Sequence, residues 1–391
     1  MQVNPAAGGM ASSGIREIMN AAWGQEGVLH LEVGQPNFVT PRHVVEAADQ
    51  AARAGHTGYT PTAGIPELRA ALADKIRQRN GFTVDWGQVV LANGGAQGIY
   101  ASLVALTEPG DGILLPDPAW PNFVMMAALL RLEVAHYSLT LSRGYQPDVS
   151  ELDRLVTPRT RVLLLNSPSN PLGSVIDRER MTALLEFAAR HDLWVLSDEC
   201  YDEITFDATA ISPAALDRDD RVVTVFSFSK TYAMTGWRLG YVAAPPVVAD
   251  VLVKAQEPLV SCINTPAQYA GLAALGSPPG VIDGMVAAYR RRRDSVVDQL
   301  SGLGMSAFRP SGAFYTWVDV SGTGLSAREF ALRLLADKQV AVAPGTAFGV
   351  GGEGSVRISL AASEADLAEG SLRLARLWRE LRERLPAGQA D

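Results

Sequence analysis

Residues 227–241 read Ser227-Phe228-Ser229-Lys230-Thr231-Tyr232-Ala233-Met234-Thr235-Gly236-Trp237-Arg238-Leu239-Gly240-Tyr241, which sets one lysine among hydroxyl side chains with an arginine further along. The preceding residues 222–226 (VVTVF) are mostly β-branched and indicate a buried strand, so Lys230 lies just past a strand end. Open α/β sheets bind their ligands at the carboxyl ends of strands. The stretch therefore predicts a ligand site on an α/β sheet.

The chemistry of this stretch suits an aldehyde that carries a phosphate group. A lysine amine attacks a carbonyl only in its neutral form, which burial or a neighbouring cation such as Arg238 favours. The guanidinium of Arg238 presents a fork that matches phosphate oxygens in pairs. We therefore predict a pyridoxal 5′-phosphate site in which Lys230 forms a Schiff base and Ser227, Ser229 and Arg238 share the phosphate. A surface loop with one basic residue is the plainer alternative.

Two more apolar runs end in polar side chains that belong at the same edge of the sheet. Residues 163–165 lead to Asn170 in a turn rich in Asn, Pro and Gly, and residues 193–196 lead to Asp198 and Tyr201. An acid there pairs with a protonated ring nitrogen, while Tyr201 and Asn170 reach a ring oxygen; such contacts tune a pyridoxal ring as an electron sink. The alternative for Asp198 is a helix N-cap after a strand.

The run Gly94-Gly95-Ala96-Gln97 follows an apolar strand pattern, residues 89–92, and precedes an expected helix over residues 98–106. Backbone amides at a helix N-terminus point at anions, and the helix dipole favours negative charge there. We therefore expect Gly95, Ala96 and Gln97 to bind the phosphate.

Together these motifs resemble the class I/II aminotransferases, which are fold-type I pyridoxal-phosphate enzymes, and in particular their prokaryotic aspartate-aminotransferase-like subgroup. The resemblance spans nearly the whole chain and rests on several motifs in the expected order. The motifs are Gly34-Gln35-Pro36-Asn37-Phe38, Tyr59 through Gly64 to Leu68-Arg69, Gly94-Gly95-Ala96-Gln97, Asp117-Pro118-Ala119-Trp120, Asn170-Pro171-Leu172-Gly173, Asp198 to Tyr201, the Lys230 run, Pro310-Ser311-Gly312-Ala313-Phe314-Tyr315 and Arg357.

The resemblance implies a role for each matching residue around the cofactor. Lys230 is then the Schiff-base lysine, Asp198 the partner of the pyridine nitrogen, and Trp120 the aromatic side chain stacked on the ring. Tyr201 and Asn170 bind the ring hydroxyl oxygen. Stacking of a flat heteroaromatic ring on an aromatic neighbour contributes about 0.5–1.5 kcal/mol beyond area burial; a core tryptophan is the alternative for Trp120.

The resemblance also implies a substrate site and a second subunit. Arg357, on a strand pattern, binds the substrate α-carboxylate, and Gly34 allows that carboxylate to approach from the opposite side, so the substrate-binding residues are Gly34, Asn170 and Arg357. Tyr59 reaches the phosphate from the neighbouring subunit, which predicts a homodimer. Ala96 departs from the family pattern, because a serine or threonine often supplies a hydroxyl there.

The predicted reaction is amino transfer between an L-amino acid and a 2-oxo acid by a ping-pong mechanism through the Lys230 Schiff base. A β/γ-lyase or a cyclising enzyme on the same scaffold is the main alternative, because fold and cofactor do not fix the reaction type. A non-catalytic pyridoxal-phosphate-binding regulator is disfavoured by the acidic balance and by the absence of a DNA-binding extension. The substrate side chain stays open among dicarboxylic, aromatic, neutral and unusual amino acids. Arg16 is the candidate for a distal carboxylate, with a solvated helix residue as the alternative.

Composition excludes several classes of protein. The net charge of −8 and the pI near 5.3 argue against a nucleic-acid surface, and the basic run 290–293 reads as a solvated helix face. Cys200 and Cys262 are far apart, and the five histidines are scattered, so we expect no disulfide and no metal site. No signal segment and no span of ~20 apolar residues is evident, so we expect a cytoplasmic protein without membrane contact.

The chain of 391 residues is long enough for about two domains. Short apolar strands alternate with helical patterns, which indicates a mostly parallel sheet flanked by helices. We predict an α/β fold in which residues 46–277 form a large pyridoxal-phosphate-binding domain and residues 1–45 and 278–391 form a smaller α/β domain. The last element expected is an amphipathic helix with Leu372, Leu374, Leu377, Trp378, Leu381 and Leu385.

Overall fold

The computed structural model describes residues 3–10, 13–278 and 280–384. Within these residues the largest sheet has seven strands in the order β2-β8-β7-β6-β5-β3-β4. Only β8 runs against its neighbours in this sheet, so the sheet is mostly parallel as predicted. Its strands are β2 (Val89–Ala92), β3 (Gly112–Asp117), β4 (Glu133–Ser138), β5 (Thr160–Asn166), β6 (Trp194–Asp198), β7 (Val222–Ser227) and β8 (Gly240–Ala243).

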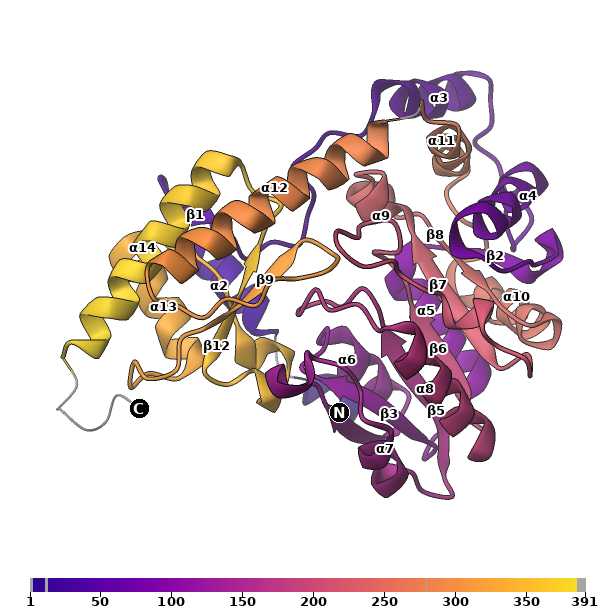
Figure 1. Ribbon diagram of the computed structural model, residues 1–391. Coiled ribbons are helices and arrows are strands. Elements are labelled where there is room, and N and C mark those ends of the chain that lie inside the picture. Colours follow the sequence, from indigo (N-terminus) through magenta and orange to yellow (C-terminus); the bar gives the residue numbers. More distant parts are fainter. Residues whose placement is uncertain (1–2, 11–12, 279, 385–391) are drawn as a thin grey trace.

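Helices cover both faces of this sheet, and the central strands are buried on both sides (Figure 1). Along β5, Val162 and Leu164 belong to the core under α5, α6 and α10, while Leu163 and Leu165 belong to the core under α7 and α8. This alternation follows from the strand period of two residues. The helices of this part are α3 (Arg42–Arg53), α4 (Pro66–Lys75), α5 (Gly94–Leu106), α6 (Asn122–Leu129), α7 (Val149–Leu155), α8 (Arg178–Arg190), α9 (Phe228–Thr231), α10 (Pro246–Val260) and α11 (Thr265–Leu275).

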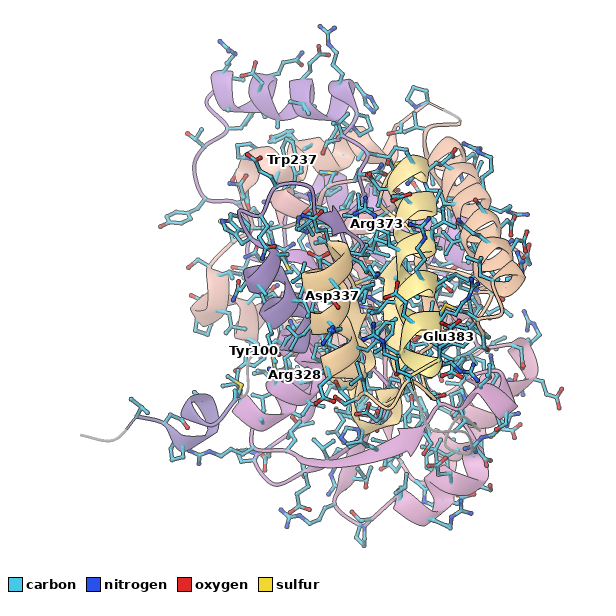
Figure 2. All side chains as sticks on the ribbon, turned by 90° about the vertical axis from the view of Figure 1, so that its left-hand side faces the viewer. Tyr100, Trp237, Arg328, Asp337, Arg373 and Glu383 are labelled. Atoms are coloured by element: carbon cyan, nitrogen blue, oxygen red, sulfur yellow. The ribbon has the colours of Figure 1, made fainter. Side chains whose placement is uncertain are left out.

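A second part of the molecule joins the two ends of the chain. A three-stranded antiparallel sheet has the order β11-β12-β9. It packs with the helices α12, α13 and α14, which lie side by side in Figure 2. β1 (Leu29–His30) pairs with β10 (Val340–Ala341), and α2 (Gly14–Ala22) contacts α13 and β11. The N-terminal segment therefore packs with the C-terminal region. The other elements are α1 (Pro5–Gly8), β9 (Tyr315–Asp319), β11 (Ala343–Pro344), β12 (Ser355–Ser359), α12 (Val281–Gly302), α13 (Ala327–Lys338) and α14 (Glu364–Arg382).

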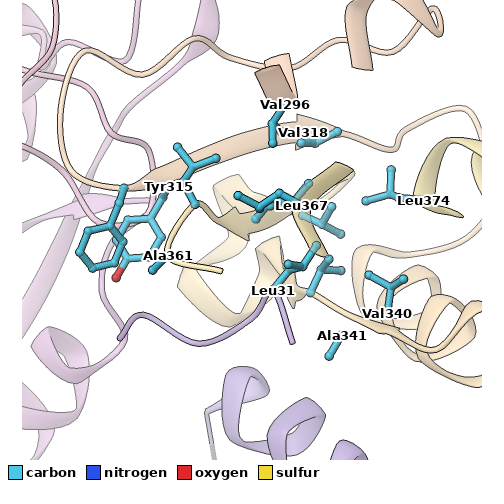
Figure 3. Close-up of a cluster of buried hydrophobic side chains, with 14 of the residues drawn as sticks. Leu31, Val296, Tyr315, Val318, Val340, Ala341, Ala361, Leu367 and Leu374 are labelled. Atoms are coloured by element: carbon cyan, nitrogen blue, oxygen red, sulfur yellow. The ribbon is translucent and has the colours of Figure 1, made fainter. Parts of the chain in front are cut away.

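One apolar cluster fills this second part (Figure 3). Leu31 from the N-terminal segment, Val318 from β9 and Val340 from β10 are fully buried in it together with Leu367 and Leu374 from α14. Of the apolar face expected of the last helix, Leu374 and Leu377 are buried in this cluster and Trp378 and Leu381 pack against it, whereas Leu372 is half-buried and is not part of it. The expected Leu385 lies outside the described residues.

The basic run 290–293 is not a solvated helix face, and that prediction was wrong for two of its four residues. Arg290 and Arg291 are exposed on α12, but Arg292 is 7% exposed and Arg293 is 3% exposed. Arg292 Nη1 donates to Asn37 Oδ1 at 2.9 Å, and its guanidinium lies over aromatic rings. A run of charged residues on a helix predicts a solvated face. The prediction fails here because residues distant in sequence supply hydrogen-bond acceptors and aromatic rings that allow an arginine to be buried.

One helix begins earlier than expected, and the predicted domain boundaries can be located among the helices. The helix predicted from residue 98 begins at Gly94, because the glycine run itself forms the first turn of α5. The predicted domain boundary at residues 45 and 46 falls inside α3, which packs against α11. The boundary at residues 277 and 278 falls between α11 and α12.

We expected no disulfide, no metal site and no membrane-spanning helix. The structure bears on these expectations only for the described part of the chain. Cys200 and Cys262 are free thiols. Among the described residues no group of three or more His, Cys, Asp and Glu side chains is arranged to hold a metal ion. The same residues include no helix with the length and apolar character needed to cross a bilayer.

Truncation of the α14 anchor tests this core. Leu374→Ala removes a fully buried side chain, so we expect the free energy of unfolding to fall by about 2–5 kcal/mol. Equilibrium denaturation followed by circular dichroism measures the change. The matched control is Leu141→Ala, because Leu141 is 56% exposed and its loss costs at most about 0.5 kcal/mol. Equal denaturation midpoints for the two variants would contradict the assigned packing.

Candidate active site

Three neighbouring strands deliver polar side chains to one cavity. β5 ends at Asn166 beside Asp198, the last residue of β6, and β7 ends just before the short helix α9 that carries Lys230. The cavity lies at the carboxyl ends of these strands, where the sequence predicts it. The residues that line it are Ile15, Met19, Val33, Gly34, Gly95, Ala96, Trp120, Asn170, Asp198, Cys200, Tyr201, Ser227, Ser229, Lys230, Arg238, Tyr315 and Arg357.

Lys230 is held as a partly neutral amine inside the cavity. Its Nζ donates a hydrogen bond of 2.6 Å to the carbonyl oxygen of Gly34. Burial lowers the pKa of Lys230 to about 8, and the guanidinium groups of Arg357 and Arg238 act in the same direction. Lys230 is therefore a far better nucleophile and base near neutral pH than an ordinary lysine.

Asp198 faces the cavity from the end of β6 and is only 5% exposed. Its Oδ1 accepts a hydrogen bond of 3.1 Å from the backbone N–H of Cys200. Burial raises the pKa of Asp198, while the Cys200 hydrogen bonds and the charge of Lys230 oppose that rise. A cationic ring nitrogen opposite this carboxylate would hold it ionised, which fits the predicted partner of Asp198.

The turn after β6 is anchored behind the cavity. Ser197 and Ser212 donate hydroxyl hydrogen bonds of 2.9 and 2.8 Å to Glu199 Oε1. Lys75, which is nearly buried on α4, forms an ion pair with Asp202. These contacts flank the residues between Asp198 and Tyr201, so the turn that presents both side chains is held from two sides.

A glycine cradle and an arginine form the predicted phosphate corner. Gly94 has a φ of 77°, and a Cβ added there would lie 2.5 Å from Arg238 Nη2. A Cβ added at Gly95 would lie 2.5 Å from the Sγ of Cys200. Glycine at position 94 therefore lets the first turn of α5 approach Arg238, and glycine at position 95 lets it approach Cys200.

The other two phosphate candidates belong to the start of α9. Ser227 is the N-cap of α9, and its Oγ accepts a hydrogen bond of 3.1 Å from the backbone N–H of Ser229. Arg238 has a left-handed backbone with φ of 53° and donates to the carbonyl oxygen of Thr235 at 2.9 Å. Backbone amides, hydroxyls and a guanidinium thus meet at one end of the cavity, and this donor set fits a phosphate.

Arg357 is buried on β12, with 2% of its surface exposed. Its Nη1 donates to Asn170 Oδ1 at 2.8 Å, and its Nη2 donates to the carbonyl oxygen of Glu32 at 2.6 Å. The guanidinium lies over the ring of Tyr315 at 4.2 Å, and Nε has no hydrogen-bond partner. A buried cation with a spare donor at the cavity wall fits the carboxylate of an amino acid.

The structure adds wall residues that the sequence did not single out as site residues. Ile15 and Met19 come from α2, and Val33 precedes Gly34. Tyr315 lies in a motif already noted, and its hydroxyl is 2.7 Å from that of Tyr201. The spacing of Ile15 and Met19 by four residues marks one helix face, but nothing in the sequence indicates that this face lines a site.

Two predicted cofactor residues do not line the cavity of the single chain. Tyr59 is 92% exposed and lies in a separate surface groove. The side chain of Gln97 is turned away, since its Nε2 donates to Gln256 Oε1 at 2.5 Å. Arg16 is exposed on α2 and does not line the cavity either.

Comparisons with known proteins agree with this geometry. A family model described as aminotransferase class I and II matches residues 26–373. The chain belongs to that family. It is 38% identical to an aspartate aminotransferase of Pyrococcus abyssi, covering 94% of this chain and 96% of the relative. It is 37% identical to aromatic-amino-acid aminotransferase 2 of Thermococcus litoralis, again over 94% and 96% of the two chains.

A solved structure shares the fold of this aminotransferase. Aspartate aminotransferase from Thermus thermophilus with maleate superposes with a TM-score of 0.92 at 36% identity, covering 96% of this chain and 100% of that one. The predicted fold type and family are therefore confirmed. As a member of this family the protein is a pyridoxal-phosphate-dependent aminotransferase. The partly neutral amine of Lys230, the buried carboxylate of Asp198 and the glycine cradle all fit that cofactor.

The reactivity of Lys230 should depend on pH around its lowered pKa. A pKa of about 8 instead of 10.5 makes the neutral amine about 300-fold more abundant at neutral pH. We expect reductive methylation of Lys230 in the cofactor-free protein to rise with pH and to be half-maximal near pH 8. Peptide mass spectrometry across a pH series measures this. A midpoint above pH 10 would show that the site does not hold the amine partly neutral.

Proposed function

We propose that this aminotransferase carries out both half-reactions in the cavity at the ends of β5, β6 and β7. An amino acid first leaves its amino group and departs as a 2-oxo acid, and a second 2-oxo acid then takes the amino group away. The observation that carries the proposal is the convergence of three groups on one cavity: the partly neutral amine of Lys230, the buried carboxylate of Asp198 and the buried guanidinium of Arg357.

The cavity has a place for each part of the cofactor. When bound, pyridoxal 5′-phosphate supplies an aldehyde that condenses with amines and a ring that withdraws electrons. Asp198 would hold the ring nitrogen, and Trp120 would cover one face of the ring. Tyr201 and Asn170 would bind the ring oxygen, since burial raises the pKa of Tyr201 and keeps its hydroxyl proton in place. The phosphate would be held by the backbone amides of Gly95, Ala96 and Gln97 and by the side chains of Ser227, Ser229 and Arg238.

Lys230 is the proton carrier in this proposal. Its Nζ would take the proton from the substrate α-carbon. It would then deliver a proton to the carbon that comes from the aldehyde group of the cofactor. A base whose pKa lies near the working pH suits both steps, because neither protonation state is strongly disfavoured. In the cofactor-free cavity the carbonyl oxygen of Gly34 accepts a hydrogen bond from Nζ, so the amine is oriented before it meets the cofactor.

Arg357 would bind the substrate α-carboxylate and so fix the α-carbon near Lys230. Its position is set by Asn170 and by the carbonyl oxygen of Glu32, which leaves the guanidinium little freedom. The hydroxyl of Tyr315 lies where a side chain at Gly34 would otherwise sit, since an added Cβ would be 2.3 Å from it. Glycine at position 34 therefore leaves the room that the Tyr315 hydroxyl occupies beside the site.

The working unit proposed is a homodimer in the cytoplasm. Tyr59 is almost fully exposed on its own chain, as expected of a side chain that completes the phosphate site of a second copy. A two-fold dimer would exchange the two Tyr59 side chains reciprocally.

A single-turnover experiment tests the role of Asp198. When cofactor-loaded protein receives a reactive amino acid without any 2-oxo acid, we expect the bound cofactor's absorbance to change and one equivalent of 2-oxo acid to appear. Asp198→Asn removes a charged hydrogen bond that is worth about 1.5–3 kcal/mol, so this rate should fall at least about tenfold.

The control for this variant makes the same change in the exposed turn before β6. Asp192→Asn alters a fully exposed carboxylate at a positive φ that asparagine tolerates, and it should react at the wild-type rate. A near-normal rate for Asp198→Asn would refute its role. Accumulation of ammonia together with the 2-oxo acid would show that the protein catalyses elimination and not amino transfer.

Hybrid dimers test the exchange of Tyr59. Lys230→Ala and Tyr59→Ala subunits are each expected to be severely impaired as homodimers. Unfolding and refolding them together in equal amounts gives hybrids with one intact site, so activity should return to about a quarter of the wild-type value. Size-exclusion chromatography checks that dimers form. Failure to regain activity in mixed dimers would place Tyr59 outside the partner's site.

A further inference from the structure

One wall of the cavity is apolar and comes from the N-terminal helix. Ile15 and Met19 are one helical turn apart on α2, so they share a face, and both line the cavity beside Val33. Ile18 and Ala22 continue the same apolar stripe of α2 and are buried in the core of the second part of the molecule. One edge of the stripe therefore anchors the helix, while Ile15 and Met19 along the other edge border the site.

Each cation that lines the cavity already has a task under the proposed function. The described residues place only Lys230, Arg238 and Arg357 in the lining as positively charged side chains. Lys230 serves the cofactor aldehyde, Arg238 the phosphate and Arg357 the substrate α-carboxylate. Residues 11 and 12, which precede α2 and lie outside the described part, are alanine and serine. No cation is left to pair with a second substrate carboxylate.

The surface that presents Tyr59 brings no cation either. The groove around Tyr59 is formed by residues 57–59 and 262–266, and none of these carries a charge. If a partner's Tyr59 enters the site as proposed, its groove neighbours add polar and apolar groups only. The missing cation is thus not supplied by this part of a second subunit.

We infer that the preferred amino donor has an uncharged, apolar side chain, which packs against Ile15, Met19 and Val33. This inference rests on the proposed function. A substrate carboxylate against this wall would lose its hydration without gaining an ionic partner, and that loss is large for a charge. An aliphatic or aromatic side chain instead gains from leaving water. Dicarboxylic amino acids are therefore poor donors for this protein.

A panel of donors tests the inference on the cofactor-loaded protein. We expect the single-turnover rate constant divided by the dissociation constant to be on the order of 100-fold higher for L-leucine and L-phenylalanine than for L-aspartate and L-glutamate. Equal or higher values for L-aspartate or L-glutamate would overturn the inference. Reaction with none of the four would count against the proposed function, and the binding measurement below then decides the inference.

Binding of unreactive acids separates the two failures. 4-Methylpentanoate and succinate are the counterparts of leucine and aspartate without an amino group, so neither can react. Isothermal titration calorimetry with the cofactor-loaded protein should show at least about tenfold tighter binding of 4-methylpentanoate. Tighter binding of succinate would overturn the apolar subsite, whether or not any amino acid reacts.

A variant that adds a cation to the wall tests the position of the subsite. Met19→Arg should raise the efficiency with L-aspartate relative to L-leucine by at least about tenfold, because it supplies the missing partner. Asn20→Arg is the matched control, since Asn20 is exposed on the same helix and outside the cavity lining. A shift of equal size in both variants would show a long-range charge effect and would remove Met19 from the subsite. Circular dichroism confirms that both variants are folded.

Discussion

The buried guanidinium of Arg357 is the constraint on which the arrangement of this molecule depends. A cation withdrawn from water is costly unless its N–H groups find acceptors, and those acceptors come from distant parts of the chain. Asn170 lies in the loop after β5, and Glu32 belongs to the N-terminal segment. One side chain on β12 therefore ties together the large sheet, the smaller sheet and the segment that follows α2. The same arrangement places the guanidinium in the lining of the cavity, where a bound anion would offset the rest of its desolvation.

The electrostatics of the site follow from burial acting in opposite directions on an amine and an acid. Desolvation lowers the pKa of Lys230 and raises that of Asp198, so both groups are pushed toward their neutral forms. A ligand that brings an aldehyde to the amine and a cationic nitrogen to the acid relieves both penalties. Perturbed groups of this kind gather where chemistry occurs, and here Asp198 ends β6 while Lys230 follows the adjacent strand β7 on α9. The ends of β6 and β7 thus place an acid and an amine, each with a shifted pKa, where they suit the cofactor.

Much of this site could be predicted from sequence because its residues follow strands closely. Asp198 ends β6, and Lys230 follows β7 within one short helix, so local patterns alone place them at the carboxyl edge of the sheet. Gly95 likewise follows β2 directly in the first turn of α5. The family resemblance added Arg357, whose distant position along the chain gives no local indication of what it contacts.

The parts that could not be predicted depend on contacts between segments far apart in sequence. The sequence predicted that Arg292 and Arg293 are solvated. Arg292 instead donates to Asn37, and Arg293 donates to Asp207 and to the carbonyl oxygen of Pro310. These hydrogen bonds offset the cost of burying the two guanidinium groups. The wall formed by α2 has the same origin. Its apolar stripe is split between the core, which takes Ile18 and Ala22, and the cavity, which meets Ile15 and Met19, and periodicity alone does not say which neighbour each residue meets.

The second part of the molecule thereby determines one wall of the cavity. Ile18 is fully buried in the cluster that also holds Val340 of β10. Glu17 on the same helix pairs with Arg328 of α13, which Figure 2 labels. An exposed ion pair contributes little, about 0–1 kcal/mol, whereas burial of an isoleucine side chain contributes about 1.5–3 kcal/mol. The apolar anchor therefore sets the orientation of α2. The strands of the large sheet place Asp198 and Lys230 at the cavity, while the packing of one N-terminal helix places the apolar wall.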